Sequence, residues 1–139
     1  MAQTVRDVMT TDLVTCPSSA PVKDAAGYMR DRDIGDVLVV DNGSVCGIVT
    51  DRDIVVRCVA EGGDTREATV GDVCSADVTT VGSDATIEEA ARLMRDKALR
   101  RLPVVDRGKP VGIVTLGDLA VDADPSSALG GISAARPSN

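Results

Sequence analysis

The sequence predicts an α+β fold built from two tandem repeats. Residues 4–56 align with residues 69–121 without a gap, and the copies share runs such as Val-Val-Asp-x-Gly and Gly-Ile-Val-Thr. Each copy also shows one helical apolar pattern followed by two strand patterns. A chain of 139 residues is long enough for one substantial core and too short for two large independent domains. We therefore expect two β-α-β-β-α units packed with pseudo-twofold symmetry.

The repeat borders follow from the alignment and from composition. We expect repeat 1 at residues 4–62, a linker at residues 63–68 and repeat 2 at residues 69–124. The remaining residues, 125–139, are small, polar and aperiodic, which predicts a flexible C-terminal tail.

Each repeat begins with a lead-in turn, a short strand and a helix. In repeat 1 the turn is expected at residues 4–9 and the strand at residues 13–16, which Pro17 ends. The helix is predicted by apolar residues spaced to form one face, namely Val22, Ala25, Ala26 and Met29, with Ile87, Ala90, Ala91 and Met94 in the second copy. Thr86-x-x-Glu89 fits a capping box that begins the second helix.

Two further strands and a closing helix complete each repeat. The continuous apolar runs at residues 37–40 and 102–105 predict buried strands. Asn42-Gly43 predicts a tight hairpin turn, and residues 106–109 are its weaker counterpart. A second strand then leads into the motif Gly-Ile-Val-Thr-x-x-Asp, which stands at residues 47–53 and 112–118.

The repeated motif has two readings. Thr50 with Asp53, and Thr115 with Asp118, fit the capping box of a helix N-terminus, and for four residues alone this reading is favoured. The chemical reading uses the same geometry, because a helix N-terminus attracts phosphate and a threonine hydroxyl can donate to it. A carboxylate only accepts hydrogen bonds and so suits two ribose hydroxyls. Finding the motif twice, each time after an apolar strand, favours a nucleoside phosphate site.

Composition excludes several classes of function. The net charge of −7 disfavours nucleic acid as a partner. No apolar run is long enough for a membrane span and the start has no signal-like segment, so a soluble cytoplasmic protein is expected. The chain has no histidine, P-loop or G-x-G-x-x-G, which argues against an enzyme, a metal site and a cofactor. The four cysteines are expected to be reduced, partly buried thiols, namely Cys16, Cys46, Cys58 and Cys74.

The paired motif, the order of elements and the Leu-Pro-Val-Val-Asp strand of the second repeat resemble the CBS domain, here as a tandem pair called a Bateman module. The chain is similar to small stand-alone bacterial CBS proteins, and the resemblance covers residues 4 to about 121. It implies a non-enzymatic sensor or regulatory module that binds an adenine nucleotide, such as AMP or ATP, in two clefts between the repeats. It also implies dimerisation into a flat disc.

The resemblance nominates a set of residues for each cleft. In the second cleft Thr115 and Asp118 are joined by Arg101, which is placed to reach phosphate, and adenine would be held by Thr80, Val81, Leu102 and Pro103. The first cleft would use Thr15, Cys16, Val37, Leu38, Thr50 and Asp53. There Asp36 replaces the arginine and would repel phosphate, although Arg52 could compensate. We therefore expect the second cleft to be the better nucleotide site. The alternatives are core packing for the apolar residues and an exposed pair for Arg100 and Arg101.

The closing helix of repeat 1, at residues 54–60, is apolar almost all round. It predicts a homodimer joined through the closing helices, or else packing against the chain's own tail. A second hypothesis for function is a ligand-free structural or protein-interaction dimer with vestigial clefts. Asp36 and the lack of an attached effector domain favour that alternative.

Overall fold

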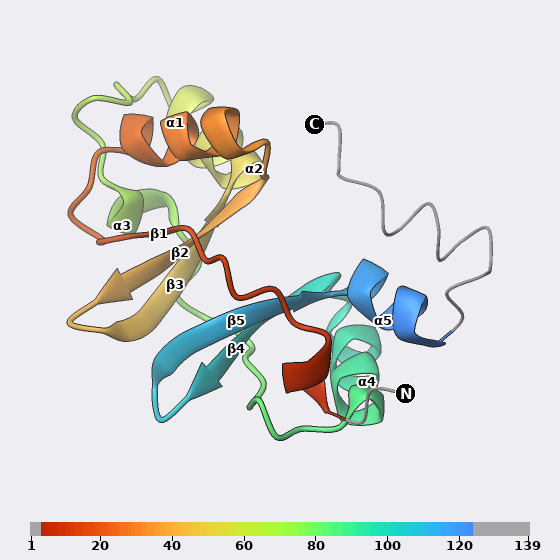
Figure 1. Ribbon diagram of the computed structural model, residues 1–139. Helices are drawn as coiled ribbons and strands as arrows, with labels where there is room; N and C mark the ends of the chain where they lie inside the picture. Colours follow the sequence, from red (N-terminus) through yellow and green to blue (C-terminus); the bar gives the residue numbers. More distant parts are fainter. Residues whose placement is uncertain (1–3, 124–139) are drawn as a thin grey trace. The chain divides into compact units, whose positions relative to one another are not determined.

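The computed structural model describes residues 4–123, and the α+β fold with strands and helices in each repeat is confirmed there (Figure 1). The expected tail at residues 125–139 lies outside the described residues. Within residues 4–123 the helices are all too short or too polar to cross a membrane.

The chain forms two compact units whose borders differ from those of the sequence repeats. Residues 14–78 form one unit, here the first-repeat unit, and residues 4–13 with 79–123 form the other, here the second-repeat unit. The lead-in turn η1 (Val5–Asp7) is therefore part of the second-repeat unit, where Figure 1 shows it beside α4. Its counterpart α3 (Val70–Val73) is part of the first-repeat unit. The two repeats thus exchange their lead-in segments, residues 4–10 and 69–75.

The first-repeat unit contains a three-stranded sheet in the order β1 (Thr15–Cys16), β2 (Asp36–Asp41) and β3 (Ser44–Thr50). β1 runs parallel to β2, and β3 runs antiparallel to it. Helix α1 (Val22–Arg32) contributes Val22, Ala25 and Met29 to the core, where they cluster with residues of β2 and with Val70 and Val73 of the exchanged α3. The chain continues from β3 into α2 (Asp51–Ile54) and the π-helix η2 (Val55–Val59).

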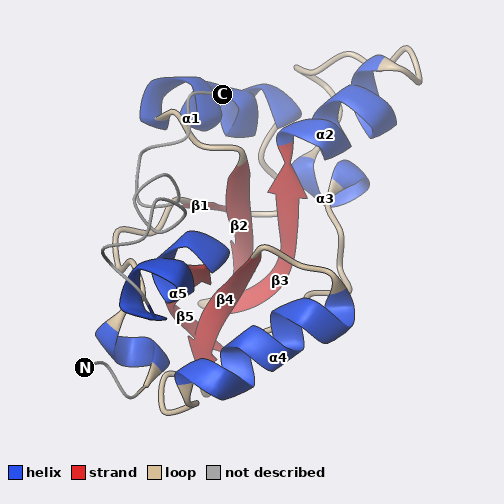
Figure 2. Cartoon of the chain, turned by 90° about the vertical axis from the view of Figure 1, so that its right-hand side faces the viewer, coloured by secondary structure: helices blue, strands red, loops and turns tan. Residues whose placement is uncertain are grey.

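The second-repeat unit contains the antiparallel hairpin of β4 (Arg101–Asp106) and β5 (Lys109–Thr115), followed by α5 (Leu116–Ala123). Figure 2 shows α4 (Ile87–Lys97) lying along this hairpin. The capping box at its start is confirmed, with Glu89 N donating to Thr86 Oγ1 over 3.0 Å. The expected apolar face is wrong at Ala91, which is exposed, because Leu93 packs against the core in its place.

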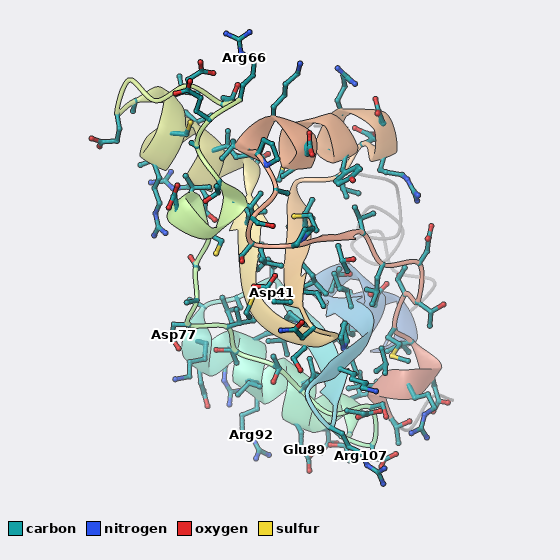
Figure 3. All side chains as sticks on the ribbon, turned by 90° about the vertical axis from the view of Figure 1, so that its left-hand side faces the viewer. Asp41, Arg66, Asp77, Glu89, Arg92 and Arg107 are labelled. Atoms are coloured by element: carbon teal, nitrogen blue, oxygen red, sulfur yellow. The ribbon has the colours of Figure 1, made fainter. Side chains whose placement is uncertain are left out.

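Both hairpins turn in the same way although their sequences differ. Asn42 and Gly43 have φ of 54° and 80°, and Arg107 and Gly108 have φ of 56° and 80°. Two successive positive φ values are what a tight hairpin matched to strand twist requires. Arg107, labelled in Figure 3 at the tip of its hairpin, therefore holds a left-handed conformation that asparagine adopts more readily.

The expected first strand of the second repeat is wrong, because only the single bridge between Val81 and Val104 forms there. Pro103 explains why this strand does not form. In the first-repeat unit Leu38 N donates to Val14 O over 3.1 Å and so anchors β1. The second repeat has Pro103 at the equivalent position, and proline has no N–H to donate.

The first glycine of each motif is required by an exchanged lead-in segment. The segment's backbone pairs with the strand that carries the first residues of the motif, between Thr10 and Ile113 in one unit and between Ser75 and Ile48 in the other. A Cβ on Gly112 would stand 2.6 Å from Met9 Sδ and 2.9 Å from Thr10 O, and one on Gly47 would stand 2.9 Å from Ser75 O. Only glycine admits this close backbone approach.

Gly112→Ala should therefore destabilise the protein by about 1–3 kcal/mol, because the Thr10 carbonyl cannot move aside as cheaply as the Met9 side chain. Urea unfolding measures the effect. Gly82→Ala is the matched control in the same unit, since its Cβ would meet only Asp106 Oδ1 at an ordinary 3.8 Å. Equal stability of the two variants would show that lead-in docking does not depend on Gly112.

Candidate functional site

Strand register places one charged residue beside each motif. The β4–β5 ladder sets Arg101 directly opposite Thr115, and the β2–β3 ladder sets Asp36 directly opposite Thr50. Side chains of directly opposed residues lie on the same face of a hairpin and are close neighbours. The second motif therefore has the exposed Arg101 beside its threonine, whereas the first has an aspartate that is only 8% exposed.

Both motifs form the capping box, as the structural reading of the sequence predicts. Thr115 N donates to Asp118 Oδ2 over 2.8 Å, and Asp118 N donates to Thr115 Oγ1 over 3.1 Å. Thr50 and Asp53 make the same two contacts, each at 3.0 Å. Each cap uses one carboxylate oxygen, Oδ2, so Oδ1 is the atom through which either aspartate could accept a ligand hydroxyl.

The start of α5 offers a donor for an anion. Leu116 N donates to Arg100 O over 2.7 Å, and Asp118 N is used by the cap. Of the first-turn amides, which have no acceptor within the helix, Gly117 N–H is the one that neither contact uses. Residue 117 also has no side chain to hinder an approaching ligand. The first motif has Arg52 at this position, with an exposed side chain and with its N–H donating to Asp51 Oδ1 over 2.8 Å.

The residues nominated for adenine lie on neighbouring segments of their own unit. Val81 N donates to Pro103 O over 3.1 Å and Val105 N to Val81 O over 2.8 Å, which brings residues 80–81 beside residues 102–103. In the first-repeat unit Thr15 pairs with Leu38 and Cys16 with Val39. Thr15 and Thr80 are exposed, whereas Val37 and Leu102 are buried in their cores. Core packing thus accounts for Cys16, Val37, Val81 and Leu102 of these sets.

The two sets differ in charge. Around the first motif stand three acids and two arginines, namely Asp36, Asp51, Asp53, Arg52 and Arg57. Around the second stand two arginines and one acid, namely Arg100, Arg101 and Asp118. This difference in charge favours an anion at the second motif over the first.

Arg57 is a residue near the first motif that the sequence reading missed. Its Nη1 donates to Val73 O over 3.2 Å and to Cys74 O over 3.3 Å, both in the exchanged lead-in segment. Its Nε lies 4.0 Å from Asp53 Oδ1. A signal lies one residue beyond the aligned repeats, where the same offset of 65 pairs Arg57 with Asp122.

The four cysteines are free thiols, as expected, although Cys46 is exposed rather than partly buried. Burial raises the pKa of the Cys16 thiol to about 11. Among residues 4–123 no group of three or more acidic or cysteine side chains is arranged to hold a metal ion.

Comparison with known proteins gives the family. The CBS domain model matches residues 5–59 and again residues 70–121. The CBS domain-containing protein YhcV of Bacillus subtilis is 39% identical over 118 residues, which cover 85% of this chain and 84% of that protein. Hypoxic response protein 1 of Mycobacterium tuberculosis is 36% identical over 118 residues, covering 84% of this chain and 82% of that protein.

Solved structures agree with these relatives. A Burkholderia ambifaria protein named for signal transduction and CBS domains superposes with a TM-score of 0.79 at 29% identity, covering 89% of this chain and 96% of the other. The structure of Hypoxic Response Protein I, with two coordinated zinc ions, gives a TM-score of 0.77 at 36% identity, covering 84% and 96%. A hexameric CBS-CP12 protein from bloom-forming cyanobacteria gives 0.75 at 28% identity, covering 89% and 74%.

The match over both repeats confirms the resemblance that the paired motifs indicated: this chain belongs to the CBS domain family and contains two CBS domains in tandem.

Proposed function

We propose that this protein is a non-enzymatic regulatory module that binds an adenine nucleotide at the second motif. Asp118 Oδ1 accepts from the ribose hydroxyls, Arg101 and the Gly117 N–H bind the phosphate, and residues 80–81 and 102–103 flank the adenine. The observation that carries the proposal is the register pairing of Arg101 with Thr115, which puts a guanidinium beside a capped helix N-terminus. The name of the Burkholderia relative supports a signalling role.

The proposal assigns no nucleotide to the first motif. Asp36 opposite Thr50 and the excess of acids disfavour phosphate there, and α2 has only four residues. The zinc of the mycobacterial structure is not carried over either, because no group of three or more cysteine or acidic side chains among residues 4–123 is arranged to hold a metal ion.

A second candidate is a structural or protein-interaction dimer that binds no ligand. It is favoured by the closed capping boxes, which satisfy both motifs without a ligand. It is also favoured by three exposed valines on η2, namely Val55, Val56 and Val59, with exposed fractions of 58%, 45% and 57%. In either candidate we expect a homodimer joined through the closing helices, and the hexameric relative supports oligomerisation.

Thermal unfolding with AMP and ATP separates the two candidates. Binding to the folded state alone raises the Tm. Asp118→Asn should abolish the rise, because it keeps an oxygen for the cap but replaces the second acceptor with a donor. Asp53→Asn makes the same change at the first motif and should leave the rise intact. No rise with either nucleotide at millimolar concentration would favour the ligand-free dimer.

Arg101 should discriminate phosphorylated from unphosphorylated ligands. Arg101→Gln should weaken AMP binding about tenfold or more, since a charge-assisted hydrogen bond to phosphate is worth about 1.5–3 kcal/mol. Adenosine binding should change little. Equilibrium dialysis with both ligands measures the difference, and Arg100→Gln is a control of equal charge. Equal weakening of AMP and adenosine by Arg101→Gln would contradict the assigned role.

A further inference from the structure

The backbones of the exchanged lead-in segments make the same contacts in both units. Val5 N donates to Ala85 O over 2.9 Å and Arg6 N to Ser83 O over 3.1 Å. The equivalent contacts in the other unit are from Val70 N to Ala20 O and from Gly71 N to Ser18 O, each at 2.8 Å. In each unit the serine hydroxyl also donates over 2.6 Å to the aspartate that ends the neighbouring strand, either Asp41 or Asp106.

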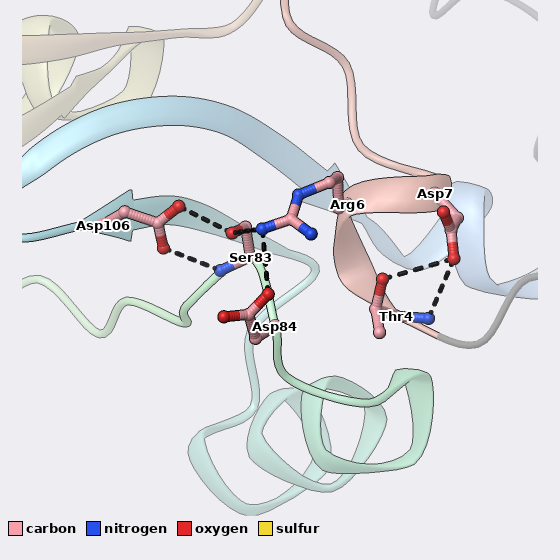
Figure 4. A network of polar contacts seen from close by, with 6 residues as sticks. All are labelled: Thr4, Arg6, Asp7, Ser83, Asp84 and Asp106. Atoms are coloured by element: carbon pink, nitrogen blue, oxygen red, sulfur yellow. Dashed lines mark hydrogen bonds and ion pairs between the residues drawn. The ribbon is translucent and has the colours of Figure 1, made fainter.

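The side chains that hold the two segments are different. In the second-repeat unit Arg6 Nη2 donates to Ser83 Oγ and to Asp84 Oδ1, each over 2.8 Å (Figure 4). Ser83 is only 2% exposed and is bound in turn by Asp106. Asp106 and Arg101 are at opposite ends of β4, so this attachment lies away from the second motif.

The first-repeat unit has no arginine in the equivalent place. Gly71 aligns with Arg6, and a Cβ there would already stand 3.1 Å from Ser18 O. The arginine that reaches this lead-in segment comes instead from the helix that follows the first motif. Arg57 donates to the carbonyls of Val73 and Cys74, at the C-terminal end of α3, where helix carbonyls have no intrahelical donor.

Arg57 also faces the motif itself. Its Nε is 4.0 Å from Asp53 Oδ1, and the Asp53 side chain is only 15% exposed. Oδ2 of the same carboxylate accepts from Thr50 N. Both oxygens of Asp53 thus belong to a chain of contacts that runs from the cap through Arg57 to the lead-in segment. In the second repeat, position 122 is an aspartate, which cannot make this link.

We propose that Arg57 is a positioning residue that joins Asp53 to the lead-in segment at residues 69–75, so that the first motif serves as a latch for this segment. The second motif is left to the ligand because Arg6 holds the other segment elsewhere. The assignment of the second motif to the ligand rests on the proposed function, but the role of Arg57 at the first motif does not.

Native-state hydrogen exchange of the full-length protein tests the latch. Arg57→Gln should speed exchange of the Ile48 and Ser75 amides, which bond to each other's carbonyls at 3.0 and 2.9 Å. Loss of a charge-assisted contact predicts an increase of about two- to tenfold. The Thr10 and Ile113 amides, which make the equivalent pair in the other unit, should not change. Arg6→Gln should give the reverse pattern.

Two controls separate a latch from general destabilisation. Arg66→Gln removes the same charge from an exposed arginine of the same unit, paired with Asp64 at 3.4 Å, and should leave all four amides unchanged. Asp53→Asn should reproduce the effect of Arg57→Gln, and the double variant should be no worse than either alone. The proposal would be overturned if Arg57→Gln sped amide exchange equally in both units or left exchange at Ile48 and Ser75 unchanged. Additive effects of Asp53→Asn and Arg57→Gln on exchange would overturn it as well. Failure of AMP to bind would overturn the proposed function and leave this result standing.

Discussion

The structure depends on the backbone pairing that attaches each lead-in segment to the strand carrying the first residues of a motif. Thr10 and Ile113 exchange two hydrogen bonds, as do Ser75 and Ile48, and both pairs require a glycine one residue earlier in the strand. These contacts attach the lead-in segment to one strand of each hairpin. They also bring apolar residues of the lead-in, such as Val5 and Val70, into the core. The strand that is held in this way ends at the motif threonine, so the position of each helix N-terminus follows from lead-in docking.

Under the proposed function, the same capping geometry serves two purposes. A capped N-terminus with a carboxylate is a stable helix start, and it becomes a binding site for a nucleotide only where its surroundings supply a positive charge and an unused donor. Arg101 and the Gly117 amide meet these conditions at the second motif. At the first motif Asp36 stands opposite the threonine and Arg57 engages the aspartate. Divergence at a few positions therefore separates two copies whose backbones remain alike.

The sequence was sufficient for features that depend on local or periodic signals. The tandem repeat, the helices, the hairpins and the capping boxes that begin at Thr50, Thr86 and Thr115 followed from spacing alone. Features that depend on long-range packing were not predictable in this way. Exchange of the lead-in segments leaves no periodic signal in the sequence. Pro103 prevents a strand because it has no N–H to donate to a residue far away in the sequence, and the sequence does not show that pairing. Arg57 was missed because its partners, Val73 and Cys74, are backbone carbonyls that any sequence would provide.

We infer that one of the two motifs, and only one, binds an adenine nucleotide. Calorimetric titration of the unmodified protein with AMP tests this most directly, because the stoichiometry counts the occupied motifs. We expect one AMP per chain, with an affinity that falls as salt rises because Arg101 is exposed and its contact with phosphate would be screened. Two equivalent sites per chain, or no heat of binding at millimolar AMP, would contradict it.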